Sequence, residues 1–410
     1  MHETTSRTCR ICGGVVEKCL DLGRQPVSNS FVPLERTADE TFFHLVVGIC
    51  TSCTMVQQFE EVRRDRMFHQ DYPYRPSESA AMRKHFEKQA QRLLETELTG
   101  PDAFIVEIGS NDGILLKTIS EAGVRHLGVD PSGGAAELAA GKGIRTRVDF
   151  FEESTGRAIR AEDGPADVIF SSNTFSHIAY IDSVLRGVVE LLGPDGVFVF
   201  EDRYLGDIVA RTSFDQIYDE HFYLFAGRSV QAMVARFGLE VVDVEHLPVH
   251  GGSIRYTAAH AGARRPSAAV RALLEEEETK GLADLATFRT VEARIQQIRE
   301  DLVALLRRLR AEGRTVVGYG ATARSATVTS FCGIGPDLVP YVCDSTPEKQ
   351  GCVMPGSHIP VRPSTAFADP YPDYALLFAW NHGDEIMAKE REFRQTGGKW
   401  ILYTPDVHIV

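Results

Sequence analysis

The chain has 410 residues, of which 43% are hydrophobic and 25% charged, as expected for a globular protein of two or three domains. Its 57 acidic and 44 basic residues give a formal net charge of −13, which argues against a nucleic-acid partner and against binding to an anionic membrane. No apolar run approaches the roughly 18 residues of a membrane span, and the polar first residues lack the apolar core of a signal peptide, so we expect a cytoplasmic protein.

Four of the eight cysteines form two C-x-x-C pairs near the N-terminus. Each pair presents two thiolates to one point, and disulfides are disfavoured in a cytoplasmic protein, so the pairs favour a tetrahedral zinc site. The segment between the pairs exceeds a minimal ribbon, and we expect a small hairpin inside it. Residues 1–70 are therefore predicted to form a zinc-binding domain in which a structural ion replaces a large core. The expected ligands are Cys9, Cys12, Cys50 and Cys53.

An α/β domain is expected over residues 71–262. It opens with an amphipathic helix that ends at Gly100-Pro101. Strands and helices then alternate, which predicts five parallel strands with crossover helices, closed by an antiparallel hairpin that turns at His250-Gly-Gly252. The expected strands are 104–109, 126–130, 144–149, 167–172 and 196–202, followed by the hairpin strands 239–247 and 252–259.

The segment Glu107-Ile-Gly-Ser-Asn-Asp-Gly113 joins the first strand to a helix. Such a Gly-rich turn places bare backbone N–H groups beside a ligand, and Asp130, roughly twenty residues further on, would bind a ribose diol. An ordinary strand-turn-helix connection is the alternative. The pattern E-x-G-x-x-x-G resembles motif I of class I methyltransferases, which have a Rossmann-like fold and bind S-adenosylmethionine. The expected donor-binding residues are Glu107, Gly109, Asn111, Gly113, Asp130, Asp149 and Phe150.

Residues 263–312 carry no strand pattern and are predicted to be linker helices. Their apolar stripe (Val291, Ile295, Ile298, Leu302, Leu305, Leu309) steps by three and four residues. The stripe lasts less than three heptads, which favours a helix packed on its own domains over a short coiled coil.

A second Rossmann-like α/β unit is expected over residues 313–410, with strands that begin near Thr315 and at 338–344, 374–380 and 400–403. Gly318, Gly320 and Ala323 fit the fingerprint G-x-G-x-x-A, and Asp344 lies at a suitable distance. Taken alone, this fingerprint indicates NAD.

Groups that transfer protons are dense directly after the fifth strand, in Ile217-Tyr-Asp-Glu-His-Phe222. His221 has an ordinary pKa near 6.5, which suits a general base, and Glu220 is placed to orient it. His177 follows the fourth strand and approaches from the same edge of the sheet. A surface loop, or a histidine with a structural role, is the alternative for each.

Six motifs occur in one order over nearly the whole chain: paired C-x-x-C, Y-x-Y-x-x-S-x-S, E-I-G-x-N-D-G, Y-D-E-H, H-G-G-S-x-R and G-Y-G-A-T-A. Together they resemble the zinc-containing sugar C-methyltransferases of antibiotic deoxysugar biosynthesis, and most closely the NDP-sugar C-3-methyltransferases of the D-tetronitrose and D-kijanose type. The resemblance implies that a base removes the C3 proton of a dTDP-4-keto-deoxysugar. The resulting 4-enolate attacks the S-adenosyl methyl group with inversion at C3. The implied catalytic residues are Tyr72, His177, Tyr218, Glu220 and His221.

The same resemblance assigns the C-terminal unit to the dTDP-sugar, with its Gly-rich turn around the diphosphate. The expected substrate contacts are Tyr74, Gly320, Ala321, Arg324, Trp380 and Asn381. Tyr72 and Tyr74 are candidates for a lid over the site, with simple packing as the alternative. Two departures stand out. Pro76 and Glu78 lie where a Ser-Ser pair is more common, which puts this lid and the accepted sugar in question. Asp130 replaces a common Glu, a change that the ribose contact should tolerate.

Two other classes of protein remain open on sequence alone. An NAD-dependent nucleotide-sugar oxidoreductase or epimerase would use the C-terminal fingerprint and would carry a nicotinamide. A zinc-bearing nucleotide sensor would bind S-adenosylmethionine without turning over any keto sugar. A monomer is one option for the oligomeric state.

Overall fold

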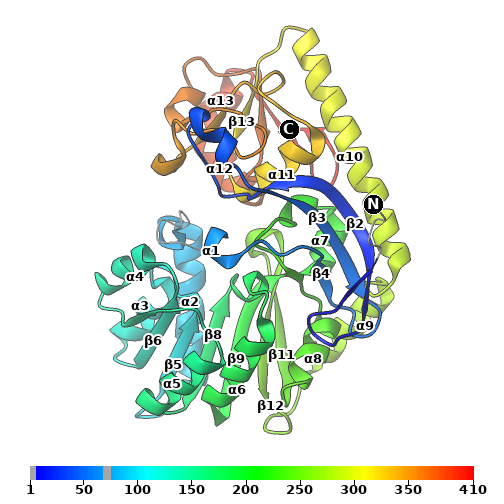
Figure 1. The fold of residues 1–410 in the computed structure, drawn as a ribbon. Helices are drawn as coiled ribbons and strands as arrows, with labels where there is room; N and C mark the ends of the chain where they lie inside the picture. Colours follow the sequence, from blue (N-terminus) through cyan, green and yellow to red (C-terminus); the bar gives the residue numbers. More distant parts are fainter. Residues whose placement is uncertain (1–5, 68–74) are drawn as a thin grey trace.

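The computed structural model describes residues 6–67 and 75–410, which form three β-sheets with their helices (Figure 1). In Figure 1 the orange and red C-terminal unit lies above the cyan and green central unit. One hydrophobic cluster includes buried residues of all three sheets, such as Val47, Val106 and Val342. Within the described ranges, none of the helices combines the length and apolar character needed to cross a membrane.

The N-terminal sheet has the strand order β1-β2-β3-β4-β10. The hairpin expected between the cysteine pairs is present as β2 and β3, which pair antiparallel. The fifth strand, β10, comes from the central part of the chain and pairs with β4. The strands are β1 (Ser6–Thr8), β2 (Val15–Pro26), β3 (Phe42–Cys50), β4 (Val56–Gln58) and β10 (Tyr223–Leu224). Short helices lie at Leu34–Asp39, Arg64–Met67 (α1) and Pro76–Glu78.

The central sheet has the order β11-β12-β9-β8-β5-β6-β7. Five strands are parallel, and β12 is antiparallel to both β9 and β11, which confirms the predicted class I methyltransferase arrangement. The central strand β5 is buried along its whole length, as in a parallel sheet that is covered on both faces. The strands are β5 (Phe104–Ile108), β6 (Arg125–Asp130), β7 (Thr146–Val148), β8 (Ala166–Ser172), β9 (Leu192–Arg203), β11 (Leu239–Leu247) and β12 (Ser253–His260).

Helices connect these strands, and the first of them, α2, begins at a Ser79 cap whose side chain accepts a hydrogen bond from the Met82 amide. The α-helices are α2 (Ala80–Thr96), α3 (Ile114–Glu121), α4 (Gly133–Ala140), α5 (Glu153–Asp163), α6 (Ile181–Leu191), α7 (Leu205–Arg211) and α8 (Gly227–Ala235). Short 3-10 turns lie at Phe175–His177, Phe214–Gln216 and Val249–Gly251.

Helices α9 (Ala268–Thr279) and α10 (Leu285–Ala311) occupy the segment expected to be linker helices. The apolar stripe of α10 is buried within this chain, against elements that include β2 and α7, so packing on its own domains and not a coiled coil accounts for it. One position of the predicted stripe is wrong: Leu306 is buried, and Leu305 is only partly buried.

The C-terminal sheet has the order β15-β14-β13-β16-β17-β18, with β18 antiparallel and the other strands parallel. The strand expected from residue 338 begins only at 342, because a turn over Gly335–Leu338 and then Pro340 precede it. The strand expected over 374–380 ends at 377. The elements are β13 (Val316–Tyr319), α11 (Ala323–Cys332), β14 (Val342–Asp344), β15 (Val361–Pro363), β16 (Tyr374–Leu377), α12 (Gly383–Lys389), α13 (Arg391–Gln395), β17 (Lys399–Leu402) and β18 (His408–Ile409), with short 3-10 turns at Pro347–Lys349, Ser364–Phe367 and Trp380–His382.

Candidate active site

A cavity of about 540 Å³ lies where the three sheets meet. Its lining includes Asn29, in the turn after strand β2, the carboxyl ends of the central strands and the turn at Thr322. This volume is in the range of small-molecule sites, and the edge of the sheet is the one at which Rossmann-like folds bind ligands. The cavity is therefore the candidate active site.

Six of the seven residues predicted to bind the donor line this cavity: Glu107, Gly109, Asn111, Asp130, Asp149 and Phe150. Gly113 does not line the cavity. Its lack of a side chain leaves room for Ile144, because a Cβ at this position would lie 2.2 Å from Cδ1 of Ile144. A Cβ on Gly109 would meet the Thr174 side chain at 2.3 Å. Both glycines also have a positive φ, which other residues adopt at a cost.

Asp130 closes β6 and organises the loops on both sides of it. One of its carboxylate oxygens accepts the Asn111 amide at 2.9 Å and the other accepts the Ser132 amide at 2.8 Å. Burial raises the pKa of Asp130 despite these two bonds. A carboxylate fixed in this way presents its remaining lone pairs to the cavity, where a ribose hydroxyl would donate to them.

Glu107 is buried, and its Oε2 atom has no hydrogen-bond partner. Burial, reinforced by the charges of Asp130, Asp112 and Glu201, raises the pKa of Glu107 well above its ordinary value. A cluster of acids around an unpartnered buried oxygen fits a cationic, hydrogen-bonding ligand. S-adenosylmethionine is such a ligand, because it carries a sulfonium and an ammonium group.

Arg64 was not anticipated from the sequence, where no motif surrounds it. It lines the cavity and lies over two aromatic rings, at 4.3 Å from the centroid of Phe150 and 4.7 Å from that of Tyr180. Its NH1 atom lies 2.6 Å from Oε1 of Glu152. These contacts fix the Phe150 ring, which lines the cavity and was predicted to bind the donor.

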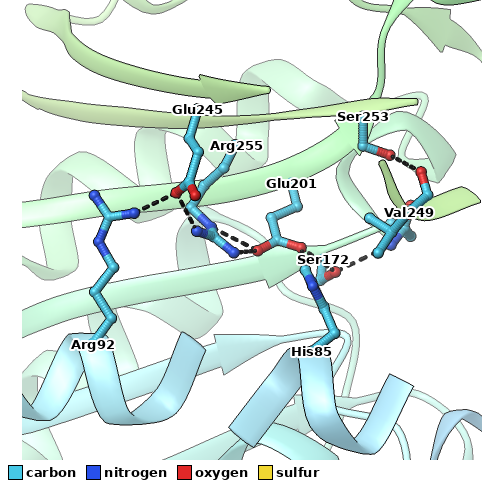
Figure 2. A network of polar contacts seen from close by, with 9 residues as sticks. His85, Arg92, Ser172, Glu201, Glu245, Val249, Ser253 and Arg255 are labelled. Carbon is cyan, nitrogen blue, oxygen red and sulfur yellow. Dashed lines mark hydrogen bonds and ion pairs between the residues drawn. The ribbon is translucent and has the colours of Figure 1, made fainter. Parts of the chain in front are cut away.

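A polar network around the buried residues Glu201 and Arg255 connects helix α2 to the central sheet (Figure 2). Glu201, at the end of β9, accepts a hydrogen bond from Nε of Arg255 at 2.6 Å and lies 2.7 Å from Nε2 of His85. Arg255 also pairs with Glu245, which contacts Arg92. Figure 2 shows that this chain of charges ties helix α2, which carries His85 and Arg92, to the sheet. The side chains of Met82 and Phe86, also on α2, line the cavity.

The predicted catalytic residues Tyr218, Glu220 and His177 line the cavity, whereas His221 lies directly behind Tyr218. The ring centroids of Tyr218 and His221 are 3.9 Å apart, and the His177 ring stacks on His221 at 5.1 Å. Glu220 accepts a hydrogen bond from Nδ2 of Asn29 at 2.6 Å. Tyr218, His221 and His177 are thus neighbours, and Glu220 lines the same cavity.

Burial and the nearby positive charge of Arg203 keep the histidines of this cluster neutral. They lower the pKa of His177 to about 3 and that of His221 well below its ordinary value. Nδ1 of His221 contacts the carbonyl oxygen of Gln216, so this nitrogen carries the proton and Nε2, which has no hydrogen-bond partner, carries the lone pair. Burial raises the pKa of Tyr218, so its hydroxyl is protonated.

Three basic residues line the half of the cavity that faces the C-terminal unit: Arg203, Arg324 and Lys349. Arg324 donates to the carbonyl of His250 at 2.9 Å, and its NH1 atom has no partner. Nε and NH1 of Arg203 have no hydrogen-bond partner, and NH1 lies 3.8 Å from Oδ1 of Asp202. Lys349 donates to the Ala321 carbonyl at 2.8 Å, and burial lowers its pKa. Of the three, only Arg324 was predicted; the position of Arg203 directly after an expected strand is the signal that could have revealed it.

The Gly-rich turn of the C-terminal unit reaches the cavity through Thr322, Ala323 and Arg324, and not through Gly320 and Ala321. Gly320 has φ +89°, and a Cβ there would lie 2.9 Å from that of Ala379. The carboxylate of Asp344 accepts the amides of Ala321 and Thr346. The turn therefore presents the first residues of helix α11 to the cavity.

Of the other predicted substrate contacts, Asn381 lines the cavity and Trp380 does not. Nε1 of Trp380 donates to Asp215 at 2.7 Å, and Tyr403 donates to the same oxygen at 2.8 Å. Asp215 thus fastens the C-terminal unit to the loop that leads to Tyr218. Tyr72 and Tyr74 lie outside the described residues. Pro76 and Glu78, the positions that depart from the family pattern, line the cavity.

The metal centre lies beside strand β4 of the N-terminal sheet, where Nε2 of Gln57 donates to Sγ of Cys9 at 3.0 Å. The sulfur atoms of Cys9, Cys12, Cys50 and Cys53 all lie within 4.8 Å of one another, a spacing that fits tetrahedral thiolate coordination. Backbone amides after the cysteines donate to sulfur, as at Ile11 (3.3 Å) and Ser52 (3.4 Å). Four thiolates without an open position make a structural zinc site.

Three family models match the chain in order: "Putative zinc binding domain" over residues 9–68, "Methyltransferase domain" over 81–244 and "C-methyltransferase C-terminal domain" over 248–405. C-methyltransferase NovU of Streptomyces niveus is 35% identical over 410 residues, which cover 98% of this chain and 96% of NovU. An uncharacterized methyltransferase of Mycolicibacterium gilvum is 26% identical over 95 residues, 23% of this chain and 37% of that protein.

Among solved structures, magnesium protoporphyrin IX methyltransferase (ChlM) from Synechocystis PCC 6803 with bound SAH has a TM-score of 0.35 at 12% identity and covers 44% of this chain and 83% of its own. The similarity to NovU instead extends over all three sheets and is accompanied by matching models for each part of the chain. The chain thus belongs to the family of S-adenosylmethionine-dependent C-methyltransferases that carry an N-terminal zinc-binding domain, which confirms the resemblance inferred from its motifs.

Proposed function

We propose that the protein transfers a methyl group from S-adenosylmethionine to C3 of a dTDP-4-keto-deoxysugar, with inversion, in antibiotic deoxysugar biosynthesis. The division of the cavity carries this proposal. An acid-rich half around Glu107 and Asp130 suits the cationic donor, and a basic half around Arg203, Arg324 and Lys349 suits a diphosphate. The cluster of Tyr218, Glu220 and the histidines lies in the same cavity, where an acceptor carbon would have to meet the methyl group.

The chemistry requires a base, an oxyanion contact and alignment. The base removes the C3 proton, and the electron pair of the C–H bond passes into the 4-enolate. The enolate carbon then forms a bond to the methyl carbon while the C–S bond breaks and S-adenosylhomocysteine leaves. A C–H group beside a ketone is too weak an acid for a neutral imidazole unless the enolate oxygen receives hydrogen bonds. The protonated hydroxyl of Tyr218 and the guanidinium of Arg203 are the donors available for this.

We propose His221 as the acceptor of the C3 proton and Tyr218 as the alternative. In favour of His221 are its free Nε2 lone pair and its contact with Tyr218. In favour of Tyr218 is its direct exposure to the cavity. We assign Glu220 to orienting His221, and His177 to donating a hydrogen bond to the enolate oxygen as the alternative to Tyr218. Tyr72 stays a predicted catalytic residue, as the family resemblance implies.

Incubation with labelled S-adenosylmethionine and a panel of dTDP-4-keto-deoxysugars tests the function. We expect one labelled methyl group on C3 of at least one sugar, identified by mass and by NMR, and no transfer to the matching 4-hydroxy sugars, which cannot form the enolate. Reduction or epimerisation of the sugars with a bound nicotinamide would instead identify the oxidoreductase or epimerase. Donor binding without turnover of any keto sugar would indicate the sensor.

A further inference from the structure

The catalytic loop, defined here as residues 217–224, is held by the zinc-binding domain along five consecutive residues. The Tyr218 and His221 carbonyls both accept hydrogen bonds from Nε2 of Gln58, at 2.5 and 2.7 Å. The Phe222 carbonyl accepts the Gln58 amide at 2.9 Å. Between them, the Asp219 carboxylate accepts the Ser28 amide at 2.9 Å, and that of Glu220 accepts Nδ2 of Asn29. No other element contributes so many bonds to this loop among the contacts of the described residues.

The two carbonyls define the orientation of the Gln58 amide. An amide NH₂ group has two hydrogens, one for each carbonyl, whereas the amide oxygen in that place would face two acceptors. Gln58 is also buried, with 1% of the residue exposed, so water does not replace these bonds. The Gln58 side chain therefore spans the turn that carries the candidate base and its tyrosine neighbour.

The strand that carries Gln58 also contacts the metal centre. Strand β4, which carries Gln58, begins three residues after Cys53. Gln57 donates to Sγ of Cys9 at 3.0 Å and accepts the Arg10 amide at 3.0 Å, and the Arg10 side chain donates to the Gln58 carbonyl at 2.6 Å. Both cysteine pairs thus determine where β4 lies, and the catalytic loop completes the same sheet as β10.

We propose that Gln58 is a positioning residue for methyl transfer, through which the zinc site sets the geometry of the catalytic loop. The zinc-binding domain then acts on the chemical step and not only on folding. The inference rests on the proposed role of Tyr218 and His221 in proton removal. It makes a separate claim about the loop itself, which is measured without any sugar.

The test compares Gln58→Met with Gln25→Met in the zinc-loaded protein. Both glutamines are buried in the same domain, but Gln25 donates to the Leu22 carbonyl and has no bond to the catalytic loop. For Gln58→Met we expect one zinc per chain, native donor affinity, and faster amide hydrogen exchange confined to residues 217–224. We expect kcat to fall on the order of 10- to 100-fold, because small misplacements of catalytic groups are costly. The KM of the donor should not change. Gln25→Met should keep native kcat and native exchange in the loop.

Native kcat in Gln58→Met, or a loss of kcat with native exchange in residues 217–224, would overturn the proposal. Chelation of the native protein provides a second arm in case the variant does not fold. We expect zinc removal to abolish turnover and to expose residues 217–224 while donor binding survives, with recovery on adding zinc. Loss of donor binding and of exchange protection in β5 and β6 together would show that zinc holds the whole fold, and would refute a selective role.

The loop-exchange measurement also separates this inference from the proposed function. If the native protein methylates none of the keto sugars but Gln58→Met still loosens residues 217–224, then the assigned substrate is wrong and the positioning contact stands. If the native protein methylates a keto sugar at C3 and Gln58→Met does so at the native rate, the function stands and the positioning role fails.

Discussion

Nε2 of His85, on helix α2, lies 2.7 Å from Oε2 of Glu201, at the end of strand β9. Burial opposes ionisation of Glu201, but His85 and Arg255 together lower its pKa below the ordinary value. The carboxylate is therefore charged in the folded protein, and it fastens the helix that lines the donor cavity.

Glu201→Gln should destabilise the protein by roughly 3 kcal/mol at pH 7, because it removes the buried carboxylate that pairs with the buried Arg255. A lowered pKa stabilises the fold above the ordinary Glu value and ceases to do so as the pH falls through the folded-state value. The difference between native and variant should therefore shrink below about pH 4.3. Denaturant titrations at several pH values measure this difference in the free energy of unfolding. The exposed pair Lys117–Glu121 supplies the control, and Glu121→Gln should have almost no effect.

Asp130→Asn should weaken donor binding by about 1.5–3 kcal/mol, the value of a hydrogen bond to a charged group. The amide keeps the shape of the side chain and one acceptor for the Asn111 and Ser132 amides. Isothermal titration with S-adenosylhomocysteine measures the change. Because burial raises the pKa of Asp130, native affinity should begin to fall at a higher pH than for an ordinary Asp. An unchanged dissociation constant in the variant would show that Asp130 does not bind the ribose of the donor.

Arg324→Met should raise the KM of the nucleotide sugar by about 10- to 100-fold and leave donor affinity unchanged, since a charge-assisted contact to the diphosphate would be lost. Arg314→Met is a suitable control in the same unit, because Arg314 is exposed and pairs with Asp373. Equal KM values for the Arg324 variant and the native protein would show that the diphosphate does not bind at the turn before α11.

His221→Asn should stop both methyl transfer and exchange of the C3 proton with deuterated water when S-adenosylhomocysteine replaces the donor. Loss of a general base costs about 10²–10⁴ in rate. NMR of the recovered sugar follows the exchange. Persistence of exchange at the native rate would exclude His221 as the base, and Tyr218→Phe would then be the variant expected to stop it.

Acid should destabilise the native protein below about pH 6.5, the ordinary His value. The folded state keeps His177 neutral down to about pH 3, whereas the unfolded chain takes up the proton, so stability falls with pH across this interval. His177→Asn should flatten that dependence in denaturant titrations. A slope equal to the native one would mean that His177 is charged in the folded protein.

Much of the fold follows from local patterns in the sequence. The cysteine spacing, the alternation of strands in the central domain and the glycines around Gly109 each encode their structure within a few residues. Contacts between residues that are far apart in the sequence could not be predicted in this way. Arg203 lines the cavity because β9 ends there. Arg64 lines it while lying over the rings of Phe150 and Tyr180, which are far away in the sequence. Trp380 lies just beyond the end of β16, and its indole donates a hydrogen bond to Asp215, 165 residues away, instead of lining the cavity. No local pattern could reveal that partner.

Strand β10 has a consequence for how the protein is made and how it can be rearranged. The N-terminal sheet cannot be completed until β10 has been synthesised. Because Gln58 and Tyr218 are 160 residues apart, most of the donor-binding domain is synthesised before β10. The N-terminal segment therefore reaches its final form late, although it is translated first. For the same reason, a chimera that exchanges the donor-binding domain between relatives has to match residues 217–224 to the N-terminal segment that receives them. Exchange at the apparent domain border would separate a strand from its own sheet.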